Sequence, residues 1–183
     1  MLRPLQMAHQ CLAEIIEPGD LVVDATVGNG HDTVFLAGLK AAPYVVGFDI
    51  QCDAIERTKE RLQELGLEDQ VTLLNEGHEK VSYYVADEVK AAIFNLGYLP
   101  NSDKSIVTKP DTTLTALSSL TKQLVKGGRI ALMIYYGHEG GEQEKEAVVE
   151  WTKALSQQTW EVMSYAPLNQ VHTPPILIIL EKR

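Results

Sequence analysis

Short apolar segments alternate with longer segments of helical periodicity along most of the chain. The apolar segments have the composition of strands that are buried on both faces of a sheet. They predict seven strands, at residues 21–25, 44–49, 71–74, 91–95, 129–136, 159–165 and 176–181. The segments between them predict helices at residues 5–16, 31–40, 51–65, 114–124 and 148–155.

This alternation is typical of an α/β protein with a mostly parallel sheet and helices on both of its faces. The last two predicted strands have no helix between them, so we expect them to close the sheet as an antiparallel hairpin at one edge. A chain of 183 residues is the size of one folding unit. We therefore expect a single domain over residues 1–183.

The charge of the chain, and its distribution along the sequence, limit the functions that the protein can have. The chain has 16 basic and 25 acidic residues, a net charge of −9, which argues against a generally basic nucleic-acid-binding surface. The sign reverses locally between residues 98 and 129, whereas residues 139–150 are rich in glutamate. Both runs are interpreted as solvated helix faces, and the basic run as a candidate track for a polyanion.

Targeting and metal signals are absent from the sequence. The longest purely apolar run, residues 176–180, is far shorter than the roughly 18 residues that a membrane-spanning helix needs. The first ten residues lack the apolar core of a secretion signal. Five scattered histidines and no cluster at ligand spacing argue against a metal site. We expect a cytoplasmic protein with neither membrane nor metal as partner.

A glycine-bearing turn follows the first predicted strand directly and leads into a helix. Backbone N–H groups and a helix N-terminus meet a ligand at such a turn, and an acid at the end of the next strand, here Asp49, is placed to bind ribose hydroxyls. A dinucleotide site would have a third glycine where Thr33 stands. Asp24 and Asp32 favour a cationic ligand instead, so S-adenosyl-L-methionine, with its sulfonium and ammonium, fits better than a pyrophosphate.

Two longer motifs resemble a known family. The first is DATVGNGHDT at residues 24–33 with FDIQ at residues 48–51, and the second is NLGYLP at residues 95–100 with DKSI at residues 103–106. They are similar to those of the small bacterial class I methyltransferases long labelled rRNA methylases. Members of that family are linked to methylation of 5-aminomethyl-2-thiouridine at the tRNA wobble position. The resemblance covers nearly the whole chain.

The resemblance implies a Rossmann-like class I methyltransferase fold, S-adenosyl-L-methionine as the methyl donor, tRNA as the substrate and a homodimer. It implies that Gly28, Asn29 and Gly30 line the methionine part of the cofactor and that Asp49 binds the ribose. Gln51, Gly77 and His78 would flank the adenine, with a loop role for His78 as the alternative. The candidate cofactor residues are Asp24, Thr26, Gly28, Asn29, Gly30, Asp32, Thr33, Asp49, Gln51, Gly77 and His78.

The acceptor side is predicted in the long polar loop that begins after Asn95. Asn95 and Tyr98 resemble the ends of the Asn-Pro-Pro-Tyr motif of enzymes that methylate exocyclic nitrogens, although Leu96 and Gly97 replace the prolines. We expect Asn95, Tyr98 and Asp103 to contribute catalysis, with loop packing for Tyr98 and a surface ion pair for Asp103 as alternatives. His138 and His172 are further candidates for accepting the amine proton.

Three alternatives stay open at this point. The enzyme could methylate rRNA or another amine with the same cofactor. A nicotinamide-dependent oxidoreductase is disfavoured by the missing third glycine and by the closing hairpin. A non-catalytic nucleotide-binding module would explain the glycine turn but would leave the segment from Asn95 to Pro100 without a purpose.

Overall fold

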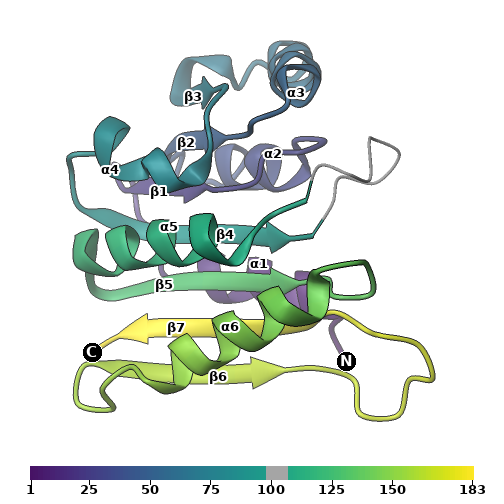
Figure 1. Cartoon of the computed structure of the whole chain (residues 1–183). Helices are drawn as coiled ribbons and strands as arrows, with labels where there is room; N and C mark the ends of the chain where they lie inside the picture. Colours follow the sequence, from purple (N-terminus) through teal and green to yellow (C-terminus); the bar gives the residue numbers. More distant parts are fainter. Residues whose placement is uncertain (98–106) are drawn as a thin grey trace.

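The computed structural model describes residues 1–97 and 107–183. Its centre is one sheet in the strand order β3-β2-β1-β4-β5-β7-β6 (Figure 1). Strands β1 to β5 run parallel, whereas β7 is antiparallel to both of its neighbours. The strands are β1 (Leu21–Asp24), β2 (Tyr44–Phe48), β3 (Val71–Leu74), β4 (Val89–Leu96), β5 (Leu124–Ile134), β6 (Trp160–Tyr165) and β7 (Ile176–Lys182). The predicted mostly parallel sheet with an antiparallel closing hairpin is thereby confirmed.

Helices cover both faces of this sheet (Figure 1). The α-helices are α1 (Pro4–Ala13), α2 (His31–Ala37), α3 (Cys52–Leu65), α4 (Val81–Tyr84), α5 (Pro110–Gln123) and α6 (Gly141–Lys153). Two short 3-10 turns, η1 (Glu68–Gln70) and η2 (His78–Lys80), flank β3. Among the described residues, no helix has the length and apolar character needed to cross a membrane.

The core is divided into two layers by the sheet. Neighbouring residues of β1 show the division, because Val22 packs with α1, α2 and α3 on one face and Val23 packs with α4, α5 and α6 on the other. Successive side chains of a strand point to opposite faces. A strand that is covered by helices on both sides must therefore be apolar at every position, as β1 is until it reaches Asp24.

The register of the parallel strands places the polar ends of three strands side by side. Asp24, the last residue of β1, pairs with Gly47 of β2 and with Ile93 of β4. Asp49 follows β2 directly, and Asn95 lies two residues beyond Ile93. The carboxyl edge of the sheet therefore gathers residues that are far apart in the sequence, as in other open α/β sheets.

The main difference from the predicted elements is the start of β5. The sequence suggests a helix through Leu124 and a break at Gly127 and Gly128, but α5 ends at Gln123 and β5 already begins at Leu124. Gly127 has φ +73°, and the pairing of β4 with β5 shifts its register between Val89 and Ala91. The glycines thus form an irregularity inside a strand and do not interrupt it.

Candidate functional site

The turn between β1 and α2 is built by glycine. Gly28 and Gly30 have φ values of +52° and +75°, a region that favours glycine because it has no Cβ. A Cβ on Gly30 would lie 2.5 Å from Thr58 Oγ1 of α3, so the backbone there also approaches its neighbour closely. Arg61 supports the turn from α3 by donating a hydrogen bond from Nη1 to the carbonyl oxygen of Asn29, over 2.9 Å.

Asp49 joins the glycine turn to the end of β2. Its Oδ2 accepts the N–H of Gly28 at 2.8 Å, and its Oδ1 accepts the N–H of Gln51, the N-cap of α3, at 2.9 Å. A carboxylate oxygen has two lone pairs, so each oxygen retains one for a further donor. The half-buried carboxylate is therefore oriented in advance and still able to accept two hydroxyl groups, as a ribose presents them.

Two more carboxylates are buried next to the turn, which leaves little water to solvate them. Asp24 is fully buried and accepts the Thr26 N–H at 3.1 Å and the Thr33 hydroxyl at 2.6 Å. Asp32 is 5% exposed. Burial, and secondly the charge of Asp32, raise the pKa of Asp24 to about 7. A site with this surplus of buried acid favours a ligand with positive charge.

Asn95 closes the site on the β4 side. Its backbone N–H donates to Thr26 Oγ1 at 2.7 Å, and its side-chain Nδ2 donates to Asp32 Oδ2 at 2.5 Å. A carboxylate accepts hydrogen bonds, so the amide must turn its NH₂ group towards Asp32. The Asn95 Oδ1 atom is then an acceptor for which the described part of the chain provides no hydrogen-bond partner.

His78 and Gly77 lie beneath the turn, where both are buried. The Nδ1–H of His78 donates to the carbonyl oxygen of Ala25 at 3.0 Å, and its ring meets Phe94 edge-on with centroids 5.5 Å apart. Burial lowers the pKa of His78, so the imidazole is neutral. Its Nε2 is a buried acceptor without a hydrogen-bond partner among the described residues. A contact of His78 or Gly77 with adenine stays a prediction.

The other residues predicted on the acceptor side are Tyr98, Asp103, His138 and His172. Tyr98 and Asp103 lie outside the described residues, so their roles stay predictions. His138 lies close to Gly97, since a Cβ on this glycine would be 3.5 Å from His138 Nε2. His172 is exposed in the connection between β6 and β7. Of the two histidines, only His138 is placed by these contacts beside the end of β4.

Hydrogen bonds join Gly97, which directly follows β4, to Thr108, and no feature of the sequence predicts this contact. Gly97 donates its N–H to Thr108 Oγ1 at 2.8 Å, and the Thr108 N–H returns a bond to the Gly97 carbonyl at 3.0 Å. Glu144 of α6, only 2% exposed, accepts the hydroxyl groups of Thr108 at 2.6 Å and Thr113 at 2.8 Å. The prediction that the glutamate run is a solvated face is therefore wrong at Glu144.

We expect Glu144→Ala to lower the free energy of unfolding by about 2–4 kcal/mol, because it leaves the buried Thr113 hydroxyl and the half-buried Thr108 hydroxyl without their acceptor. Urea denaturation measures this change. Glu146→Ala, an exposed position on the same helix, is the matched control and should change it by less than about 0.5 kcal/mol. Equal effects of the two substitutions would show that the hydrogen bonds of Glu144 add no measurable stability.

The part of the basic run that the structure describes does not form one track along the site, and Lys104 lies outside the described residues. Lys109 precedes α5 at the carboxyl edge of the sheet, but Lys122 lies in the last turn of this helix, about 20 Å away by the rise per residue. Arg129 forms ion pairs with Glu14 at 3.0 Å and Glu181 at 2.7 Å, which join α1 to β7. Of these three, Lys109 alone is both exposed and near the end of β4.

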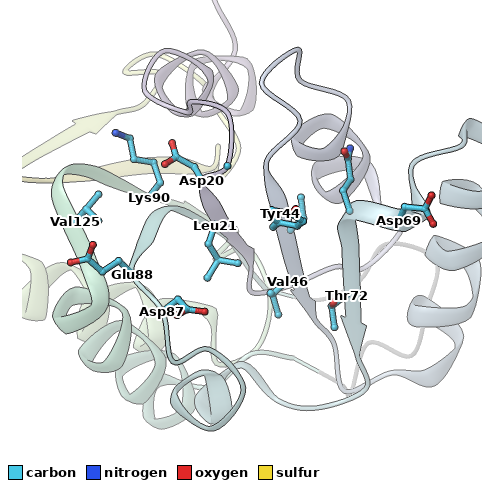
Figure 2. A pocket seen from close by; sticks show the side chains of 13 residues that line it. Asp20, Leu21, Tyr44, Val46, Asp69, Thr72, Asp87, Glu88, Lys90 and Val125 are labelled. Carbon is cyan, nitrogen blue, oxygen red and sulfur yellow. The ribbon is translucent and has the colours of Figure 1, made fainter.

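A hollow of about 670 Å³ lies at the opposite, amino edge of the sheet (Figure 2). It is lined by residues at the starts of the parallel strands, including Leu21 and Tyr44, and by the acids Asp20, Asp69 and Asp87. None of the predicted site residues contributes to it. Among the described residues, no group of three or more histidines, cysteines or acids is placed to hold a metal ion.

The strand order and the site together are typical of one class of enzymes. A seven-stranded sheet with an antiparallel β7, a glycine turn after β1 and an acid after β2 is the architecture of class I S-adenosylmethionine-dependent methyltransferases. The cofactor fits the residues present, because its cationic sulfonium and ammonium suit the buried Asp24 and Asp32 and its ribose suits Asp49.

Comparisons with known proteins support the assignment to the methyltransferases. A model of the family described as "Putative rRNA methylase" matches residues 45–181. The chain is 40% identical to the chloroplastic tRNA (mnm(5)s(2)U34)-methyltransferase of Arabidopsis thaliana, over 97% of this chain and 69% of that protein. The chain therefore belongs to this methylase family, and it is an enzyme that uses S-adenosyl-L-methionine.

Solved structures give the same result. The "putative rRNA-methylase" of Clostridium thermocellum is 45% identical, with a TM-score of 0.97 over 100% of this chain and 99% of that one. A methyltransferase structure from Streptococcus mutans, in complex with SAH, is 43% identical, with a TM-score of 0.93 over 100% and 99% of the two chains. SAH is what S-adenosylmethionine becomes after it gives up its methyl group.

Proposed function

We propose that residues 1–183 form one domain that methylates the aminomethyl nitrogen of 5-aminomethyl-2-thiouridine at the tRNA wobble position, giving 5-methylaminomethyl-2-thiouridine. The observation that carries this proposal is the 40% identity, over nearly the whole chain, with a relative named as a tRNA (mnm(5)s(2)U34)-methyltransferase. The family description favours a second candidate, methylation of an rRNA base amino group. The same site would serve both substrates, since both are amines.

For the cofactor, we propose the assignment that the sequence motifs suggest. Asp49 would bind the ribose hydroxyls with the two lone pairs that its backbone contacts leave free. The glycine turn, with Asp24, Thr26, Asp32 and Thr33 around it, would hold the methionine part. Gln51, Gly77 and His78 would border the adenine. Bound there, S-adenosylmethionine supplies a methyl group on a positively charged sulfur, which is a good leaving group.

For the acceptor, we propose that Asn95 orients the amine. Its free Oδ1 would accept one amine N–H and so direct the nitrogen lone pair towards the methyl group, because in-line geometry is the main requirement of such a displacement. The reacting amine must be neutral, because its nitrogen lone pair forms the bond to the methyl carbon while the carbon–sulfur bond breaks and leaves SAH. The secondary ammonium ion formed must then lose a proton to give the secondary amine. Tyr98 and Asp103 are proposed to contact the substrate, and His138 is the described residue best placed to accept that proton.

The assembly and location of the enzyme are further parts of the proposal. A homodimer would cover the outer strand β6, where Val162 and Met163 are 36% and 62% exposed. Two subunits would also enlarge a binding surface that Lys109 alone cannot supply to an RNA. A tRNA substrate supports a location in the cytoplasm, although the Arabidopsis relative is chloroplastic.

The test is mass spectrometry of nucleosides from tRNA that lacks this modification, before and after incubation with the protein and S-adenosylmethionine. We expect 5-aminomethyl-2-thiouridine to gain the mass of one methylene unit, and Asp49→Ala to abolish the gain. A gain on rRNA and none on tRNA would favour the second candidate. No gain on either RNA, with SAH still bound in calorimetry, would overturn both.

A further inference from the structure

His9 connects the N-terminal helix to the candidate site. Its Nε2 lies 2.5 Å from Asp32 Oδ1, and its ring stacks on Phe35 of α2 with centroids 3.8 Å apart and planes 6° from parallel. The Asp32 side chain is 7% exposed and the His9 side chain 21%. His9 thus makes two separable contacts, a hydrogen bond to Asp32 and a ring stack on Phe35.

Asp32 uses its two oxygens for two different partners. Oδ1 faces His9, and Oδ2 accepts the Nδ2–H of Asn95 at 2.5 Å. The three side chains therefore form a continuous chain from α1, through the first turn of α2, to the carboxyl end of β4. A hydrogen bond at one oxygen fixes the rotation of the carboxylate, and this rotation decides where the other oxygen points.

Asp32 needs such a partner because its surroundings are otherwise unfavourable for a charge. The charge of Asp32 raises the pKa of both Asp24 and Tyr135, so these two groups lie within its electrostatic reach. Among the described residues, His9 is the one basic side chain within ion-pair distance of Asp32. A buried carboxylate that loses its partner also loses a contact that holds its orientation.

We propose that His9 is a positioning residue for methyl transfer, which acts through Asp32 to hold Asn95 with its Oδ1 towards the acceptor. The inference rests on the proposed role of Asn95 in orienting an amine. His9 itself touches no substrate in this arrangement. Its loss should therefore change the rate of the methyl transfer step, and leave the binding of the cofactor product nearly unchanged.

Two substitutions separate the contacts of His9. His9→Phe keeps a ring on Phe35 and removes the hydrogen bond to Asp32, whereas His9→Gln keeps an N–H donor of similar reach and removes the ring. We expect His9→Phe to lower kcat by roughly 10-fold to 100-fold, since small displacements of an orienting group have effects of this size. His9→Gln should stay within about threefold of the wild-type kcat while its Tm falls.

Calorimetry with SAH and single-turnover methylation of tRNA measure these effects. The dissociation constant of SAH should change by less than about threefold in both variants, because the change concerns orientation of the acceptor. A His9→Phe variant with wild-type kcat would overturn the proposal. So would a His9→Gln variant that loses as much activity as His9→Phe, since the stack would then be the important contact.

A second readout does not depend on the identity of the substrate. In an ¹⁵N-labelled SAH complex, the Asn95 side-chain amide protons should shift in His9→Phe and return towards the wild-type position in His9→Gln. An unchanged Asn95 signal in His9→Phe would overturn the coupling through Asp32, whatever RNA is methylated. Failure of the wild-type protein to methylate tRNA would instead overturn the proposed function, and the two failures are thus distinguishable.

Discussion

Replacement of Asn95 by alanine is expected to reduce kcat by roughly 100-fold or more and to leave SAH affinity within about threefold of wild type. At the carboxyl end of β4, the Asn95 Nδ2 donates to Asp32, whereas its Oδ1 has no partner among residues 1–97 and 107–183. Removal of the side chain therefore takes away the proposed acceptor for the amine N–H. The fold should tolerate the change, because the bond to Thr26 Oγ1 comes from the Asn95 backbone.

Steady-state methylation at saturating cofactor measures the effect of Asn95→Ala on kcat and on KM for the RNA, and single-turnover methylation measures its effect on the chemical step. Gln157→Ala is the control, since Gln157 is exposed beyond the end of α6 and precedes β6 at the amino edge of the sheet. It should leave kcat unchanged. A rise in KM with an unchanged kcat would mean that Asn95 binds the substrate without orienting the reacting nitrogen.

The parallel part of the fold was predictable because each strand is covered on both faces. The strands β1, β2 and β4 are short and largely apolar, and a polar residue stands at or next to the carboxyl end of each. Asp24, Asp49 and Asn95 mark these ends in the sequence, and parallel registration brings them to one edge. The glycine turn itself was predictable because its position after β1 and its glycines are local features of the sequence.

Features that depend on contacts across the chain were not predictable. Glu144 looks like one of several exposed glutamates, and only the packing of α6 against α5 and Thr108 buries it. His9 is a single histidine on a short helix, and its partner Asp32 lies 23 residues further on. The sequence around Gly127 indicates a break between a helix and a strand, because the irregularity in which Gly127 lies is a property of the β4–β5 pair.

Asp24→Asn is expected to make the ligand-free protein more stable at pH 8 and to weaken cofactor binding by at least about tenfold, or about 1.4 kcal/mol. Asp24 is completely buried, and burial together with Asp32 holds its pKa well above the ordinary value. An asparagine keeps the shape of the side chain and can still bond to Thr26 and Thr33. The substitution thus removes an unfavourable buried charge with little change in packing.

The raised pKa of Asp24 makes the stability of the folded protein depend on pH. A carboxyl group whose pKa is raised by folding binds its proton more tightly in the folded state than in the unfolded state. Its unfavourable contribution therefore appears as the pH rises from about 4, where the unfolded group ionises, and is complete above about pH 7, where the folded group ionises. The stability gained by Asp24→Asn should be large at pH 8 and should shrink towards pH 4.

Thermal unfolding of wild-type protein and Asp24→Asn across this pH range, with and without SAH, measures both effects. We expect the Tm of the variant to exceed that of the wild type at pH 8 without ligand, and SAH to raise the Tm of the wild type by more. If Asp24→Asn were less stable at pH 8, the hydrogen bonds from Thr26 and Thr33 would outweigh the cost of burying the charge. If SAH affinity were unchanged, Asp24 would stabilise the turn alone, and the ammonium group that SAH shares with S-adenosylmethionine would have to be balanced by Asp32.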